Sequence, residues 1–316
     1  MAAAVQEDRD VLGNGELAHR SFLRNAFEYG AAVCVLGSLR YTPLGVAERL
    51  ARVYAGVLDR AVPRLRRIAL GNLAMAMPEK TEDERKRIAD GVFASIARLL
   101  VSFAKFPQIG RDSFSRWARH EGYEHFEEAR KQGRGVLLAT AHLGNWELGA
   151  LAHALDGDPM HVVVRPLDNP FIDRLVARRR AACGNRVIEK REAARPIFKA
   201  LAANETVGIL IDQNSGLDQG VFVDFFGVAA CAGTGFARIA ARSGAAAIPA
   251  FALWSVEEKR YVVRYYAPVE MTGSAEEDTA RLQKRLEAAI REYPDQWLWI
   301  HRRWKTRPAG EGPVYG

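Results

Sequence analysis

From Gly135 onward, short apolar segments alternate with longer segments typical of helices, and this alternation limits the folds that the chain can adopt. The apolar segments are 136–139, 161–164, 207–211, 246–253 and 261–265. Helix-like segments lie between several of them, for instance 171–182 and 193–203. Apolar strands that alternate with helices are typical of a mostly parallel sheet covered on both faces. We therefore predict an α/β fold in which helices flank a mostly parallel central sheet.

Polar side chains follow three of the predicted strands. His142 comes after the first strand, Arg165 after the second, and Asp212 at the end of the third. In open α/β sheets, ligands bind at the carboxyl ends of the strands. These three side chains are therefore candidates for one functional site.

The segment from Ala141 to Glu147 places a histidine on the loop after the first strand and a glutamate at the start of a helix. Asn145 is a good N-cap, which would put Glu147 in the first helical turn. Residues five apart on one helix differ by about 140° in direction, so His142 and Glu147 can meet only in a strand–loop–helix arrangement. His142 would then be a general base whose other ring nitrogen bonds Glu147. The structural alternative is a histidine packed at a strand end beside a surface glutamate.

Arg165 and Asp212 also have two interpretations each. A guanidinium at the sheet edge can hold a phosphate or a thioester oxygen, but Arg165 can instead form a salt bridge to a nearby acid. Asp212 can bind an acceptor, form a turn, or replace Glu147 as the partner of His142. Gln213 is open to the same binding and turn alternatives.

The first third of the chain predicts helices that contact a membrane. Its apolar stretch, 29–39, is shorter than the about 20 residues of a spanning helix, so an interfacial helix fits it better. The next segment, 40–67, holds seven arginines against two acidic residues, with apolar residues between them. Such a helix favours anionic lipid, although a solvated helix packed on the core has the same pattern. Apolar residues three and four apart in 88–103 predict an amphipathic helix with a core face.

Composition narrows the functional classes only in part. Hydrophobic residues make up 48% of the 316 residues, which is enough for a sizeable core. The net charge of +7 suits an anionic membrane, an acidic substrate or carrier, or nucleic acid. The three cysteines are far apart, so we expect no disulfide framework or zinc site and a reducing, cytosolic environment. Residues 1–20 carry mixed charges, and we expect no signal peptide there.

A dense group of aromatic and basic residues lies near the C-terminus. In an extended segment, Trp297, Trp299 and His301 would share one face. Tryptophans beside arginines suit a membrane interface or phosphate recognition, and Arg302 and Arg303 are the candidates for substrate contact. The same mixture suits single-stranded nucleic acid, but no nucleic-acid module is recognisable, so we expect no such partner.

Taken together and in order, five segments resemble the sequence pattern of the bacterial lipid A late acyltransferases, a family that also includes phosphatidylinositol mannoside acyltransferases. The segments are 141–147, 164–170, 211–214, 221–227 with Thr234, and 296–305. They span roughly 137–305. Their combination is far more specific than any one of them.

This resemblance implies a reaction and a fold like that of the glycerolipid acyltransferases. A fatty acyl group would pass from a thioester of acyl carrier protein or CoA to a hydroxyl of a lipid A-type glycolipid, without a metal or organic cofactor. His142 would take the hydroxyl proton, and Glu147 would orient His142. The candidate substrate-binding residues are Asn145, Arg165, Asp212, Gln213, Arg302 and Arg303. Phe222, Phe225 and Phe226 are either ordinary core residues or the lining of an acyl pocket.

The resemblance also implies an organisation and a location. We expect an N-terminal helical, membrane-associating region over 1–106 and an α/β catalytic domain over 107–316, within one continuous unit. The protein would lie on the cytoplasmic face of the inner membrane, attached peripherally or by a single N-terminal helix. Three alternatives remain: an acyltransferase for another lipid, such as a mannoside, an ornithine lipid or a lysophospholipid; a thioesterase; or a non-catalytic lipid-binding protein.

Overall fold

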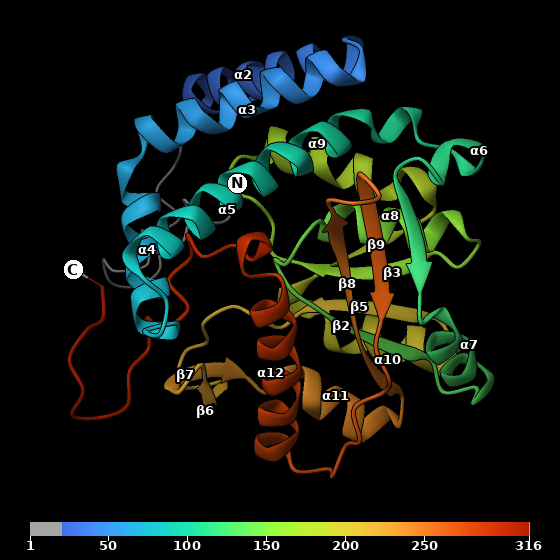
Figure 1. Ribbon diagram of the computed structural model, residues 1–316. Helices are drawn as coiled ribbons and strands as arrows, with labels where there is room; N and C mark the ends of the chain where they lie inside the picture. Colours follow the sequence, from blue (N-terminus) through green and yellow to red (C-terminus); the bar gives the residue numbers. More distant parts are fainter. Residues whose placement is uncertain (1–20, 316) are drawn as a thin grey trace.

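The computed structural model describes residues 21–315, which form a seven-stranded sheet with helices on both faces (Figure 1). In order across the sheet, the strands are β1 (Ala118–Glu121), β9 (Arg260–Tyr265), β8 (Ala246–Ser255), β2 (Val136–Thr140), β5 (Thr206–Leu210), β3 (Met160–Val164) and β4 (Arg186–Glu189). Strands β8, β2, β5, β3 and β4 are parallel, and β9 runs antiparallel to β8. The prediction of a mostly parallel sheet is therefore confirmed. Strands β1 and β4 were not predicted, because each has only four residues and two or more of them are polar.

Helices precede the sheet and connect its strands. They are α2 (Phe22–Tyr41), α3 (Leu44–Ala61), α4 (Pro63–Ala76), α5 (Glu82–Lys105), α6 (Arg111–Phe114), α7 (Tyr123–Lys131), α8 (Trp146–Leu155), α9 (Pro170–Arg180), α10 (Ala194–Ala202), α11 (Gly235–Ser243) and α12 (Ala275–Glu292). Short 3₁₀ turns occur at Phe106–Gln108, Ala181–Cys183, Lys190–Glu192 and Pro294–Gln296. Successive residues of β2 face two separate cores. Leu138 packs on the side of α5 and α8, whereas Leu137 packs against α10 and α11.

The N-terminal helices lie on one side of the sheet. Helices α2 and α3 run side by side over α5 (Figure 1). Helix α5 contains the predicted amphipathic segment, and Thr81 and Glu84 cap its start reciprocally. Helix α2 contains the apolar stretch 29–39, and none of the described helices is long and apolar enough to cross a membrane. Residues 1–20, in which we expect no signal peptide, lie outside the described residues.

A hairpin of β6 (Gly220–Phe225) and β7 (Val228–Gly233) stands apart from the main sheet. Its two turn residues, Phe226 and Gly227, have φ values of 60° and 75°, as a type I′ turn requires. The glycine tolerates this left-handed backbone without steric cost. The hairpin places Phe225 and Phe226 against the C-terminal tryptophans.

The C-terminal aromatic segment belongs to the core. Trp297, Trp299 and Trp304 are fully buried, so the prediction that these tryptophans contact a membrane or a phosphate is wrong. The rings of Trp297 and Trp299 meet edge to face with centroids 4.6 Å apart, and Phe225 and Phe226 pack against them. Large aromatic rings stabilise a core by the apolar area that they remove from water. The ordinary-core interpretation of these two phenylalanines is confirmed.

Candidate active site

His142 and Asp212 meet at one edge of the sheet. Thr140 and Leu210 are paired at the ends of the adjacent parallel strands β2 and β5, and each candidate residue lies two positions further along. The backbone N–H of His142 donates to Oδ2 of Asp212 at 2.9 Å, and Nδ1 of the ring lies 3.0 Å from Oδ1. Trp297 donates its indole N–H to the same carboxylate at 3.0 Å. Asp212 is therefore the partner of His142, the alternative that the sequence left open.

The carboxylate of Asp212 is negatively charged and determines which nitrogen of the His142 ring carries the proton. Its burial opposes ionisation, but the adjacent His142 and the hydrogen bonds hold the pKa of Asp212 well below its usual value. An ionised Asp212 accepts a hydrogen bond from the Nδ1–H of His142, which leaves the lone pair of the ring on Nε2. None of the described residues hydrogen-bonds this nitrogen. His142 can therefore accept a proton at Nε2 while Asp212 stabilises the imidazolium.

Backbone hydrogen bonds hold the loop that carries His142. Leu298 donates to the carbonyl of His142 at 3.0 Å, and Gly144 donates to the carbonyl of Gln296 at 2.9 Å. Gly144 has a φ of 65°, and a Cβ atom there would lie 2.0 Å from the carbonyl oxygen of Ala252. Only glycine fits this close approach between the loop and β8. The C-terminal segment and β8 thus fix the position of the histidine.

Asn145 is the N-cap of α8, as predicted. Its Oδ1 accepts from the backbone N–H of Leu148 at 3.0 Å, and its Nδ2 donates to the Ser102 hydroxyl at 2.6 Å. The side chain is completely buried. The expectation that Asn145 binds substrate is therefore wrong, because the protein itself occupies both ends of the amide.

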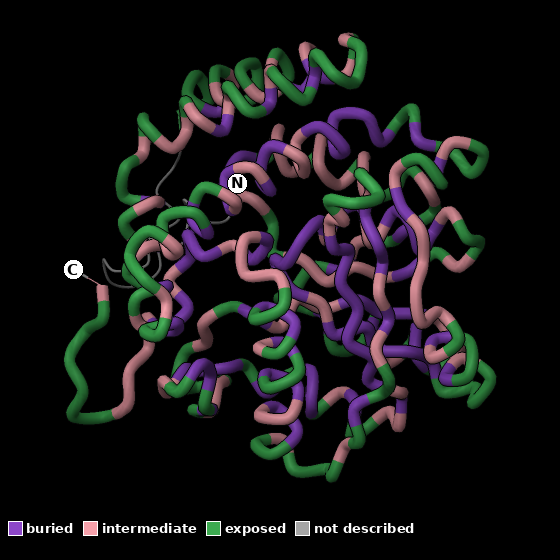
Figure 2. The backbone as a smooth tube through the Cα atoms, viewed as in Figure 1, coloured by how far each residue is buried: buried purple, intermediate pink, exposed green. Residues whose placement is uncertain are grey.

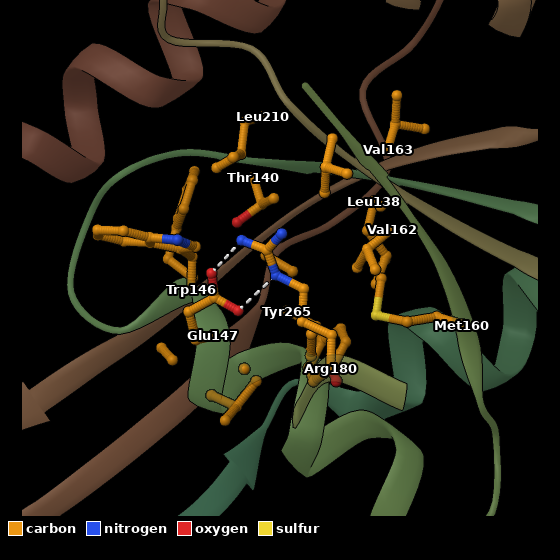
Figure 3. A pocket seen from close by; sticks show the side chains of 18 residues that line it. Leu138, Thr140, Trp146, Glu147, Met160, Val162, Val163, Arg180, Leu210 and Tyr265 are labelled. Atoms are coloured by element: carbon orange, nitrogen blue, oxygen red, sulfur yellow. Dashed lines mark hydrogen bonds and ion pairs between the residues drawn. The ribbon is translucent and has the colours of Figure 1, made fainter. Parts of the chain in front are cut away.

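Glu147 does not contact the ring of His142. Its carboxylate instead forms a bidentate pair with Arg180 of α9, with N–O distances of 2.9 and 2.5 Å (Figure 3). Burial opposes ionisation of Glu147, but the guanidinium lowers its pKa below the usual value. The expectation that Glu147 orients His142 is corrected. The first turn of α8 directs this carboxylate toward α9, while the ring of Trp146 contacts His142 with centroids 4.7 Å apart.

An apolar cavity lies between α8 and the sheet (Figure 3). It contains about 650 Å³ of space free of atoms, part of which is open to solvent. Side chains from β2, β3, β5, β8 and β9 line it, together with the Glu147–Arg180 pair and Trp146. Two glycines, Gly149 on α8 and Gly208 on β5, are part of this lining. The composition of the lining suits an apolar ligand.

A smaller recess borders His142 on the side of α5. It contains about 210 Å³ of space free of atoms, between α5, the His142 loop and the segment 296–298. Trp146 lines both this recess and the large apolar cavity. The histidine and this tryptophan therefore stand where the two spaces approach each other.

The other predicted site residues lie in different surroundings. Arg165 is exposed at the end of β3, which lies two strands from β2 and hence about 10 Å across the sheet. Gln213 is exposed next to Asp212. The guanidinium of Arg302 lies over the ring of Tyr315, 5.6 Å from its centroid.

Arg303 is completely buried, which corrects the expectation that it binds substrate. It donates to the carbonyl of Cys231 at 2.8 Å and to the side chain of Gln283 at 3.1 Å. Sequence reasoning missed Arg180 and the role of Trp297 in the site. Nothing in the sequence distinguishes Arg180 from its neighbouring arginines. Among the described residues, no three His, Cys, Asp or Glu side chains form a cluster that could hold a metal ion.

Known proteins resemble this chain over most of its length. Residues 17–306 match the family described as bacterial lipid A biosynthesis acyltransferase. The chain belongs to this family. A lipid A biosynthesis lauroyltransferase of Escherichia coli (strain K12) is 31% identical over 271 residues, which cover 85% of this chain and 88% of the relative. A palmitoleoyltransferase of the same organism is 31% identical over 252 residues, 78% of this chain and 81% of the relative.

A third relative, a lipid A biosynthesis acyltransferase of Haemophilus influenzae (strain ATCC 51907 / DSM 11121 / KW20 / Rd), is 25% identical over 276 residues and covers 86% of both chains. The lipid A acyltransferase family predicted from five sequence segments is thus confirmed, and the protein is an acyltransferase. His142, Asp212, Glu147 and Arg180 lie within the matched range.

Proposed function

We propose that this lipid A acyltransferase moves a fatty acyl chain from an acyl thioester to a hydroxyl of a lipid A-type glycolipid, with His142 as the general base. The pairing of His142 with the buried carboxylate of Asp212, beside an apolar cavity, is the observation that carries the proposal. A histidine held this way is suited to deprotonating a hydroxyl near neutral pH.

The reaction balances with these groups alone. Nε2 of His142 removes the proton of the acceptor hydroxyl as that oxygen attacks the thioester carbonyl carbon. The carbon–sulfur bond then breaks, and the departing thiolate takes the proton from the imidazolium. Asp212 stays ionised throughout and stabilises the imidazolium.

The recess beside His142 and the apolar cavity on the other side of Trp146 suit the two substrates. The acyl chain would occupy the apolar cavity, with its thioester near Trp146 and the Glu147–Arg180 pair. The acceptor hydroxyl would approach Nε2 from the smaller recess, which His142 itself lines. In this arrangement Glu147 and Arg180 are positioning residues that hold α8 against α9.

The donor would be a thioester of acyl carrier protein or of CoA. The net charge of +7 supports both, because acyl carrier proteins are acidic and CoA carries phosphates. Arg165, exposed at the carboxyl end of β3, is the proposed contact for an anionic group of the donor or acceptor.

A membrane-facing surface on α2 and α3 would bring the protein to its acceptor. Of the fourteen exposed large hydrophobic side chains in the described part of the chain, ten lie on these two helices. They are Phe22, Leu23, Phe27, Tyr29, Val33, Tyr41, Leu44, Val46, Val53 and Val57. Figure 2 shows how much of α2 and α3 is exposed. Exposed arginines on α3, among them Arg49 and Arg52, would contact anionic headgroups on the cytoplasmic face of the inner membrane.

Reconstitution tests this function directly. The purified protein is incubated in mixed micelles with labelled acyl-carrier-protein and acyl-CoA thioesters and, in separate reactions, a tetraacyl lipid A precursor, a mannoside lipid or a lysophospholipid. Mass spectrometry then identifies every acylated product and the free fatty acid. A precursor that gains one acyl chain in an ester linkage supports the proposal. Acceptor-independent fatty acid as the main product would point to a thioesterase instead.

A further inference from the structure

A group of polar side chains around His153 of α8 lies behind the cavity wall that Tyr265 forms. On α8, His153 follows Trp146 by seven residues, which is about 10 Å along the helix axis. Gly149 and Ala150 lie between them and line the cavity. Tyr265, the last residue of β9, lines the cavity and reaches across to His153.

A chain of contacts fixes the ring of Tyr265. Its hydroxyl lies 3.0 Å from Nδ1 of His153, and Nε2 of His153 lies 3.6 Å from Oδ2 of Asp158. That carboxylate in turn accepts from Arg130 at 2.6 Å and from Thr206 at 3.2 Å. Tyr265 and His153 are 3% and 1% exposed, respectively. The tyrosine is therefore an anchored wall of the cavity, because moving it would leave a buried histidine nitrogen without its partner.

Met160, in contrast to Tyr265, forms a movable part of the cavity wall. It lines the same cavity from the start of β3, but its unbranched thioether side chain can change rotamer at low cost. A Cβ atom added to Gly208 would lie 2.3 Å from the terminal methyl of Met160, so this side chain fills the space next to the glycine. A chain that outgrows the cavity can displace Met160 more easily than Tyr265.

We propose that Tyr265, anchored by His153, is the residue that limits the length of the acyl chain that this protein transfers. The inference rests on the proposed use of the cavity for the acyl chain. Relatives that are each 31% identical to this chain are named for lauroyl and for palmitoleoyl transfer, so chain length varies within the family. Each methylene group of the acyl chain that is buried in the cavity, or excluded from it, changes the affinity for the chain about fourfold.

The test is a competition among donors. The full-length protein receives an equimolar mixture of saturated acyl thioesters from 10 to 18 carbons, and mass spectrometry gives the ratio of products by length. For each protein, we compare the product whose acyl chain is two carbons longer than the wild-type optimum with the product of the optimum length. In Tyr265→Leu, we expect this ratio of longer to optimum product to rise about tenfold or more. Tyr265→Phe keeps the ring but removes the anchor, and should broaden the distribution in the same direction by a smaller factor. Gly208→Ala should shift the distribution toward shorter chains.

Matched controls separate this inference from the function on which it rests. Tyr261→Leu removes a tyrosine that is equally buried on the same strand but does not line the cavity, so it should keep the wild-type distribution. Tyr265→Phe guards against a failure of Tyr265→Leu to fold, which thermal unfolding would reveal. If both Tyr265 variants transfer the wild-type distribution, the inference is wrong while the acyltransferase function stands. If the wild-type protein transfers none of the donors, the proposed function itself fails.

Discussion

Three N–H groups converge on the carboxylate of Asp212, and this convergence makes Asp212→Asn a decisive substitution. The donors are the backbone N–H and the Nδ1–H of His142 and the indole N–H of Trp297. An asparagine offers one acceptor oxygen and an NH₂ group that donates. At least one buried N–H then loses its acceptor, which costs about 1–3 kcal/mol of stability. The NH₂ group also favours the tautomer with the proton on Nε2, where the base must accept.

The expected catalytic loss follows from this change of tautomer. In a Ser-His-Asp triad, the same exchange of carboxylate for amide lowers kcat by about 10⁴-fold with the geometry intact, and we expect a loss on the order of 10³–10⁴-fold here. Single-turnover acyl transfer, measured beside urea unfolding, separates the catalytic effect from the effect on stability. A folded Asp212→Asn protein that retains more than a tenth of the wild-type rate would refute the reasoning.

The depressed pKa of Asp212 adds a test in acid. Its pKa in the folded protein lies below the value of about 3.9 expected for an unfolded aspartate. The stabilisation from the ionised form is therefore complete above the unfolded pKa and is lost as the pH falls toward the folded pKa. The wild-type protein should lose this increment on acidification below about pH 4, and Asp212→Asn should not. The difference in unfolding free energy between the two proteins should thus shrink with falling pH.

Further expectations follow from other contacts. Glu147→Gln leaves the partly buried guanidinium of Arg180 without its carboxylate, and should lower the unfolding free energy by about 1–3 kcal/mol in urea titrations. Asn145→Ala removes the cap of α8, and should lower stability by about 1–2 kcal/mol, measured as a fall in Tm. Leu23→Asp on α2 should weaken sedimentation with anionic vesicles about tenfold or more, whereas Val256→Asp, on an equally exposed residue outside α2 and α3, should leave it unchanged.

Each of these expectations has an outcome that contradicts it. Glu147→Gln with wild-type stability would mean that the ion pair does not hold α8 against α9. An unchanged Tm in Asn145→Ala would mean that the Asn145 side chain does not stabilise the start of α8. Equal loss of vesicle binding in the α2 variant and its control would contradict a membrane surface on α2 and α3.

Much of the fold could be predicted because its signals are local. The parallel strands are short apolar runs, and their period and length distinguish them from the helices between them. Strand β1 carries Arg119, His120 and Glu121, so its membership in the sheet depends on pairing with β9, which no local pattern reports. The buried tryptophans were misread for a related reason. Aromatic and basic residues look alike in a sequence whether they face solvent or the core.

The site was predictable in its position but not in its pairing. Because ligands bind at the carboxyl ends of parallel strands, the sequence predicted His142 and Asp212 at the same edge of the sheet. The direction of Glu147 depends on where Arg180 of α9 lies, and that depends on the packing of two helices separated by a strand. Arg303 shows the same limit, because its burial results from the hairpin and α12 closing around it.

The rate of acyl transfer by His142→Ala tests the central claim most directly. Removal of a general base should lower the rate by about 10²–10⁴-fold with the fold intact. His161→Ala is the matched control, because His161 is also bonded to a carboxylate, that of Glu205 at 2.8 Å, but lies at the start of β3, away from the site. The account predicts that His142→Ala loses transfer while His161→Ala keeps it. Equal activity in His142→Ala and the wild-type protein would contradict it.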